Sequence, residues 1–96
     1  MRVGIAGYGV VGKKRYSSII KNTSFKVTDI SEVNPTARDE IPDGVNVFNN
    51  YQDLILKAKL DIIFISLPNK YTSDAVSLSL NKGLNVFCEK PPARTL

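Results

Sequence analysis

Three glycines near the amino terminus have the spacing that binds the phosphates of a dinucleotide. Gly7, Gly9 and Gly12 form G-x-G-x-x-G, after the apolar run Val3–Ala6 and before a helical pattern that starts at Val10. The first glycine permits a sharp exit from a strand, the second lets a pyrophosphate approach the backbone, and the third lets the helix lie close to the strand. The free N–H groups of that helix then face the phosphates. The residues expected to contact the cofactor here are Gly7, Tyr8, Gly9, Val10, Val11 and Gly12.

A dinucleotide site also needs an acceptor for the adenosine ribose, about 20 residues beyond the glycines. Glu32 has this spacing from Gly12 and follows the apolar segment Phe25–Ser31. Asp29 competes for the role, but it falls inside the expected strand and has no evident partner there. A carboxylate at Glu32 accepts from the 2′-hydroxyl of NAD and repels the 2′-phosphate of NADP. Arg38 follows in the next loop, so the sequence predicts NAD and leaves NADP open.

The residue inventory excludes several other chemistries. The chain has no histidine and one cysteine, Cys88, so it lacks the ligand spacing of a zinc site and the partners of a Ser/His/Asp or Cys/His nucleophile. The glycine motif also lacks the G-K-[ST] ending of a P-loop. No metal site is expected.

Composition is that of a small globular domain of 96 residues, with 43% hydrophobic and 23% charged residues and a net charge of +4. The basic cluster Lys13–Arg15 opens the first helix, where we expect Lys14 to be solvated rather than bound to phosphate. Nucleic-acid binding would need a broader basic face with aromatic residues, so no nucleic acid is expected as a partner. No apolar run reaches the roughly 18 residues of a membrane span. A single cysteine suits a reducing compartment, and we expect a cytoplasmic protein.

The elements that position these residues alternate between strand and helix. Alternation of this kind predicts an α/β fold, a Rossmann-like doubly wound parallel sheet of strand order 3-2-1-4-5 with ligand at the carboxyl ends of the first and fourth strands. The segment 32–44 is expected to be a polar loop, and Asn49 or Asn50 to cap the second helix. The expected strands are Val3–Ala6, Phe25–Ser31, Val45–Phe48, Ile62–Ile65 and Leu84–Cys88, and the expected helices Val10–Lys21, Tyr51–Lys59 and Lys70–Lys82.

Two further motifs, with the glycines and Glu32, give the chain a family resemblance. Leu67-Pro68-Asn69 follows the fourth strand, and Glu89-Lys90-Pro91 follows the fifth. Together they resemble the Gfo/Idh/MocA oxidoreductases over essentially the whole chain. The resemblance implies cofactor contacts at Leu67, Pro68, Asn69, Glu89 and Lys90, with Lys90 also the catalytic residue that contacts the substrate hydroxyl or carbonyl. One position departs from the pattern, because Thr72 stands where the family often has histidine.

Length is the larger departure, since members of that family carry a second α/β domain. We therefore expect residues 1–96 to be the dinucleotide-binding domain, the N-terminal part of a longer two-domain enzyme and inactive alone. The resemblance implies hydride transfer between a nicotinamide cofactor and a small-molecule substrate such as a sugar or cyclitol, in a homo-oligomer. A non-catalytic nucleotide-binding module for sensing or scaffolding is the alternative. A third alternative is another Rossmann dehydrogenase, because the G-Y-G-x-x-G-K motif of residues 7–13 is also similar to that of glyceraldehyde-3-phosphate dehydrogenase. Glu89-Lys90-Pro91 and the absence of a catalytic cysteine context argue against it.

Overall fold

The computed structural model of the protein describes residues 1–88 as one sheet with helices on both faces. The five strands are all parallel, and their order is β3-β2-β1-β4-β5, as predicted. The elements in chain order are β1 Arg2–Ala6, α1 Val10–Ile19, β2 Lys26–Ser31, α2 Pro35–Asp39, β3 Asn46–Phe48, α3 Tyr51–Lys57, β4 Ile62–Ile65, α4 Asn69–Asn81 and β5 Asn85–Cys88.

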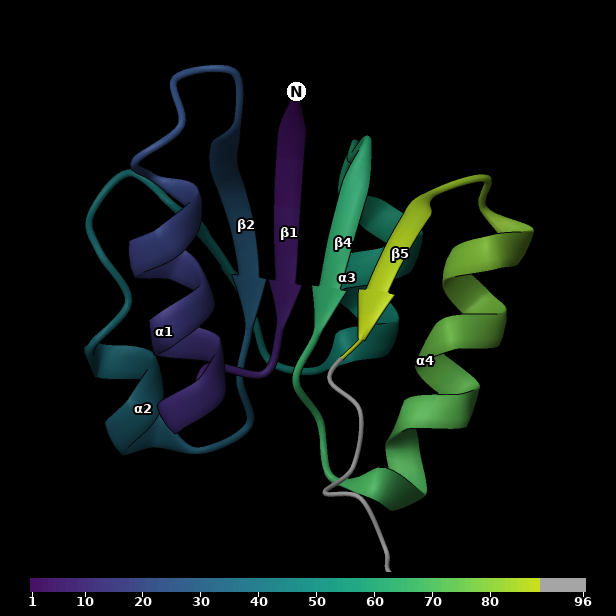
Figure 1. Cartoon of the computed structure of the whole chain (residues 1–96). Helices are drawn as coiled ribbons and strands as arrows, with labels where there is room; N and C mark the ends of the chain where they lie inside the picture. Colours follow the sequence, from purple (N-terminus) through teal and green to yellow (C-terminus); the bar gives the residue numbers. More distant parts are fainter. Residues whose placement is uncertain (89–96) are drawn as a thin grey trace, which may run out of the picture.

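The central strand β1 separates two halves of the sheet. It pairs with β2 on one side and with β4 on the other, so the strand order reverses there. Helix α1 lies in front of the strands and α3 behind them, and all five strands point the same way (Figure 1). Ligands in open α/β sheets bind at the carboxyl ends of the strands beside such a reversal.

Side chains on the two faces of the sheet form two separate cores. Ile63 and Ile65 of β4 pack with Leu54 and Ile55 of α3 and with Ala75 of α4. The opposite face packs with α1; its buried members are Val3, Ile5, Tyr8, Ile19, Val27, Ile30, Ile41 and Ile62. Strands covered on both sides are apolar throughout, which explains the continuous run in β4.

One element was not expected. The predicted loop 32–44 contains the short helix α2, because the Asn34 side chain accepts a hydrogen bond from the Thr36 N–H and Pro35 occupies the first helical turn. Both are features that start helices. The ends of α1 and α3 also differ from prediction: α1 stops at Ile19 and α3 at Lys57. The predicted cap of α3 is confirmed at Asn50, which accepts from the Asp53 N–H.

Beside α1 the sheet has an apolar hollow near β5. Phe87 of β5 is 54% exposed and stacks on Phe64 of β4, with ring centroids 5.1 Å apart. The hollow that these rings line has a volume of about 330 Å³. A strand at the edge of a sheet leaves such a surface uncovered unless another element packs on it. No helix within residues 1–88 has the length and hydropathy to cross a membrane.

Candidate nucleotide-binding site

The glycine turn has the geometry that its sequence predicts. Gly7 has a φ of 97°, a backbone conformation that side chains rarely adopt. A Cβ at Gly12 would lie 2.1 Å from the Gly7 carbonyl oxygen, because α1 packs directly on the end of β1. By contrast, a Cβ at Gly9 would have no neighbour within 4 Å. Gly9 therefore presents open backbone, where a phosphate group has room to approach.

The first turn of α1 has no side-chain cap. Gly9 is its N-cap residue and cannot accept a hydrogen bond through a side chain. N–H groups at an uncapped helix start, together with the positive end of the helix dipole, favour an anion. The open backbone at Gly9 lies at this same helix end.

Glu32 ties the glycine turn to the end of β2. Its Oε1 accepts from the Tyr8 N–H at 2.6 Å, and its Oε2 accepts from the Asn34 N–H at 2.9 Å. A carboxylate oxygen can accept more than one hydrogen bond, so both oxygens retain acceptor capacity. The acid suited to a ribose hydroxyl therefore lies against the turn suited to a pyrophosphate.

A cavity of about 440 Å³ joins these parts at the carboxyl ends of β1, β2 and β4. Five of the predicted cofactor residues line it: Gly7, Gly9, Glu32, Leu67 and Pro68. The structure thus brings together the glycine turn, the acid and the segment after β4, as expected for a dinucleotide site. This end of the sheet is the lower end in Figure 1.

The other predicted contacts within residues 1–88 do not line this cavity. Tyr8 is 4% exposed, and its ring belongs to the core beside Tyr16, so its link to the site is the backbone N–H that donates to Glu32. Val10 and Val11 are exposed on the first turn of α1, and Gly12 is buried beneath it. Asn69 begins α4 and is exposed. The predicted residues Glu89 and Lys90 lie outside the described residues.

Charged and polar side chains at the edge of the site have structural partners. Lys13 forms an ion pair with Glu40, whereas Lys14 is exposed, as expected. Arg38 donates to the Asn49 side chain at 2.5 Å. Thr72, in the position where histidine was expected by resemblance, lies 3.3 Å from both the Leu67 and Pro68 carbonyl oxygens and donates to this turn.

Asp29, the competing acid, has a structural role inside the sheet. It is 2% exposed and accepts from the Thr28 hydroxyl at 2.5 Å and from the Asn46 side chain at 3.0 Å. The Arg2 guanidinium lies 3.9 Å away. These are the partners that the sequence did not reveal. Asp29 does not line the cavity, whereas Glu32 does.

Seven further lining residues were not predicted from the sequence, and of these only Ser31, Val33 and Ser66 are next to a predicted site residue. The seven are Ser31, Val33, Asn50, Tyr51, Gln52, Ser66 and Tyr71. Within residues 1–88, the Ser66 hydroxyl oxygen is a buried side-chain atom without a hydrogen-bond partner. The predicted start of α3 at Tyr51, with its cap at Asn49 or Asn50, was the available signal, since helix starts at the carboxyl end of a sheet line such crevices.

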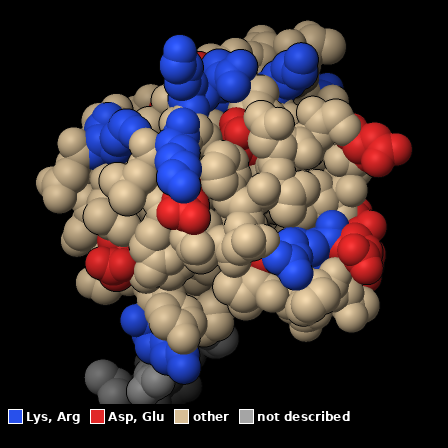
Figure 2. All heavy atoms as spheres, turned by 180° about the vertical axis from the view of Figure 1, so that it is seen from behind, with Lys and Arg blue, Asp and Glu red and all other residues tan. Residues whose placement is uncertain are grey.

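A second cavity, of about 450 Å³, lies at the opposite end of the sheet. Lys and Arg side chains gather along this end, the upper edge of Figure 2, and four of them line the cavity: Arg2, Lys57, Lys59 and Lys82.

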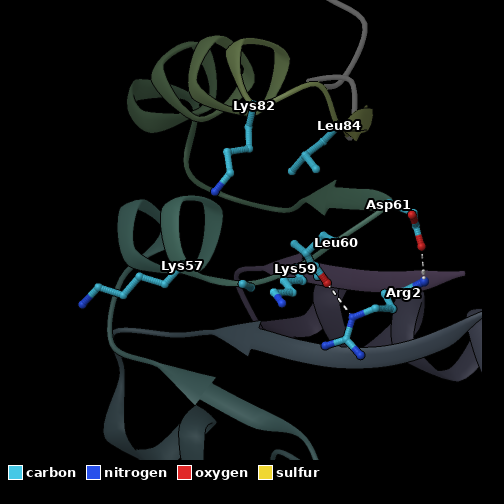
Figure 3. Close-up of a pocket in the computed structure, with 8 residues that line it drawn as sticks. Arg2, Lys57, Lys59, Leu60, Asp61, Lys82 and Leu84 are labelled. Carbon is cyan, nitrogen blue, oxygen red and sulfur yellow. Dashed lines mark hydrogen bonds between the residues drawn. The ribbon is translucent and has the colours of Figure 1, made fainter.

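Protein groups already bind several of these cations (Figure 3). The Arg2 guanidinium Nε donates to the Lys59 carbonyl at 2.6 Å, and the backbone N–H of the same residue donates to the Asp61 carboxylate at 2.7 Å. The Lys82 ammonium donates to the Leu56 carbonyl at 2.6 Å, near the end of α3. The cations at this end of the sheet thus donate hydrogen bonds to backbone carbonyls near the end of a helix.

Comparison with known proteins agrees with the geometry of the carboxyl end. The model of the Gfo/Idh/MocA oxidoreductases, described as an oxidoreductase family with an NAD-binding Rossmann fold, matches residues 1–96. The chain belongs to this family. It is an NAD(P)-binding Rossmann domain of the family's N-terminal type.

Similar proteins in the family are sugar and inositol dehydrogenases. The chain is 29% identical to the D-glucoside 3-dehydrogenase of Escherichia coli K12 over 99% of the chain and 28% of the relative. It is 27% identical to the D-xylose 1-dehydrogenase (NADP(+)) 2 of Haloferax volcanii over 95% of the chain and 29% of the relative. The structure of scyllo-inositol dehydrogenase from Lactobacillus casei with bound NAD(H) and scyllo-inositol superposes with a TM-score of 0.83 at 32% identity, covering 95% of this chain and 28% of that one. This chain thus spans less than a third of the length of each of these relatives.

Proposed function

We propose that this chain is the cofactor-binding part of a dehydrogenase that transfers hydride between a nicotinamide cofactor and a sugar, cyclitol or similar polyol. The observation that carries the proposal is the hydrogen bond from the Tyr8 N–H to Glu32. This bond holds Glu32, the proposed acceptor for the ribose, against the glycine turn. Both line one cavity beside β1, where the strand order reverses. The substrate class comes from the activities of the relatives, which are sugar and inositol dehydrogenases.

The residues present fit a dinucleotide in three respects. Open backbone at Gly9 and the uncapped start of α1 suit the pyrophosphate, and the Glu32 carboxylate suits the adenosine ribose. When bound, the nicotinamide ring accepts or donates the hydride. Glu32 orients the cofactor's adenosine half, and the walls of the cavity limit its exposure to water. By family resemblance, Lys90 is proposed as the residue that contacts the substrate hydroxyl or carbonyl.

Glu32 makes NAD the proposed cofactor rather than NADP. A 2′-phosphate beside this carboxylate would lose the ribose hydrogen bond and meet a like charge. Such an unmatched polar contact costs about 1–3 kcal/mol, so we expect NAD to bind at least about fivefold more tightly. Arg38, the residue that could favour NADP, is bound to Asn49 in this structure.

Titration of NAD and NADP into the wild-type chain and into Glu32→Gln tests the proposal. Glutamine retains an acceptor oxygen for the Tyr8 N–H while removing the charge, so the preference for NAD should narrow without loss of the turn. Asp29→Asn is the matched control: it neutralises the neighbouring buried acid and should leave the ratio of the two affinities unchanged. Equal or tighter binding of NADP by the wild-type chain would contradict the assignment.

A further inference from the structure

Two tyrosines line the same cavity as Glu32. Tyr51 begins α3 and Tyr71 lies in the first turn of α4, and both residues line the cavity. Their ring centroids are 6.0 Å apart, with the planes inclined by 47°. Tyr51 is 8% exposed, whereas Tyr71 is 41% exposed. Tyr51 is therefore the buried support, and Tyr71 is the ring that a ligand would meet.

A hydrogen bond fixes the buried ring. The Tyr51 hydroxyl donates to Asp74 Oδ2 at 2.6 Å. This bond, together with burial, raises the pKa of Tyr51 to about 12, so the phenol stays protonated and continues to donate near neutral pH. Because Asp74 lies one turn after Tyr71 on α4, the bond also holds the start of α4 against the start of α3.

The Tyr71 ring is open to a planar ligand. The Lys70 ammonium lies 5.0 Å from the centroid of this ring. Lys70 is exposed and sits on a long flexible stem, so a stacked ring can displace its ammonium without disturbing the fold. Val33, 73% exposed, and Pro68 are apolar residues that line the same cavity.

We propose that Tyr71, supported by Tyr51 and Asp74, is the stacking surface for the adenine ring of the dinucleotide. The inference rests on the proposed function, because Glu32 is there the acceptor for the adenosine ribose. Adenine is bonded directly to that ribose, so it must lie within one sugar's length of Glu32. Phosphate takes the backbone at Gly9 in this arrangement, and Tyr71 is the exposed aromatic ring that lines the same cavity. Aromatic rings stack on nucleic-acid bases because every base has a π-face.

Calorimetric titration with AMP and with nicotinamide mononucleotide separates the two halves of the cofactor. In Tyr71→Ala we expect the Kd of AMP to rise roughly 5- to 100-fold, the effect of losing one base–aromatic stack, while the Kd of nicotinamide mononucleotide stays within about twofold of wild type. Tyr71→Phe is the matched control and should bind AMP like wild type. Tyr71→Leu keeps an apolar side chain without a ring and should resemble Tyr71→Ala. Proton NMR of bound AMP should show an upfield shift of adenine H2 or H8 that disappears in Tyr71→Leu.

The outcomes distinguish this inference from the proposed function. Equal AMP affinity in Tyr71→Ala and wild type, with NAD still bound, overturns the adenine assignment and leaves the cofactor site intact. Weakened binding of nicotinamide mononucleotide with unchanged AMP affinity also overturns it, because Tyr71 would then lie at the other end of the cofactor. A folded wild-type chain that binds neither NAD nor AMP overturns both.

Discussion

The two ends of the sheet have cavities of nearly equal volume, about 440 and about 450 Å³, but their polar groups are used differently. At the amino end, Arg2 and Lys82 donate to backbone carbonyls and so complete the local structure. At the carboxyl end, Gly9 leaves open backbone, α1 begins without a side-chain cap, and the Ser66 hydroxyl has no partner among residues 1–88. Unsatisfied polar groups, rather than cavity size or charge, therefore distinguish the candidate site.

The largest expected effect is on the stability of the fold at Gly12, near the start of α1 at the carboxyl end of the sheet. Gly12→Ala places a Cβ about 2.1 Å from the Gly7 carbonyl oxygen, and neither backbone segment can move away without disturbing β1 or α1. We expect the free energy of unfolding to fall by about 3 kcal/mol, measured by denaturant unfolding followed by circular dichroism. Gly9→Ala is the control, since its Cβ meets no atom within 4 Å, and it should change stability little. Equal stability of Gly12→Ala and wild type would show that α1 does not pack this closely.

Gly9→Val, at the same end of the sheet, should weaken NAD binding without changing the stability of the fold. The branched side chain would fill the space left for the pyrophosphate, but its Cβ has no protein neighbour to clash with. We expect the affinity for NAD to fall by about 10-fold or more, or about 1.4 kcal/mol, while the unfolding curve stays close to that of wild type. The measurement is NAD titration alongside circular dichroism. Undiminished binding would place the phosphates elsewhere.

The smallest expected effect is at the amino end of the sheet, where a substitution should lower the free energy of unfolding and leave the affinity for NAD unchanged. Arg2→Met removes the hydrogen bond to the Lys59 carbonyl, which should lower the free energy of unfolding by about 1 kcal/mol. Lys26→Met removes the same charge from an exposed strand residue and serves as the control. NAD affinity should be unchanged in both variants. A weaker affinity in Arg2→Met alone would mean that the amino end contributes to the cofactor site.

The parts of the fold that follow from local pattern were predictable from the sequence. The alternation of strands and helices predicts the strand order, and the glycine spacing and Glu32 predict the position of the cavity. Helix α2 was missed because its apolar content is low, although Asn34 and Pro35 mark its start. A cap and a proline are short signals, and a polar segment between two prolines has the composition of a loop.

Contacts between distant segments were not predictable. The bond of Asp29 to Asn46 depends on the register of β2 with β3, and the packing of Tyr51 on Tyr71 depends on the placement of α3 beside α4. Spacing along the chain favoured Glu32 over Asp29 without showing what Asp29 does. Side chains that line the cavity from α3 and α4 were missed for the same reason, since helical periodicity predicts a buried face but not which residues reach the end of the sheet.

The double hydrogen bond of Glu32 has a consequence for the kinetics of binding. Because its carboxylate already holds the Tyr8 and Asn34 N–H groups, the glycine turn is ordered before any ligand arrives. The entropy of ordering this loop is then lost during folding and does not weaken the ligand's affinity. Association should accordingly be a single fast step without a slow loop rearrangement. Removal of both oxygens, as in Glu32→Ala, should add a slow phase that Glu32→Gln does not show.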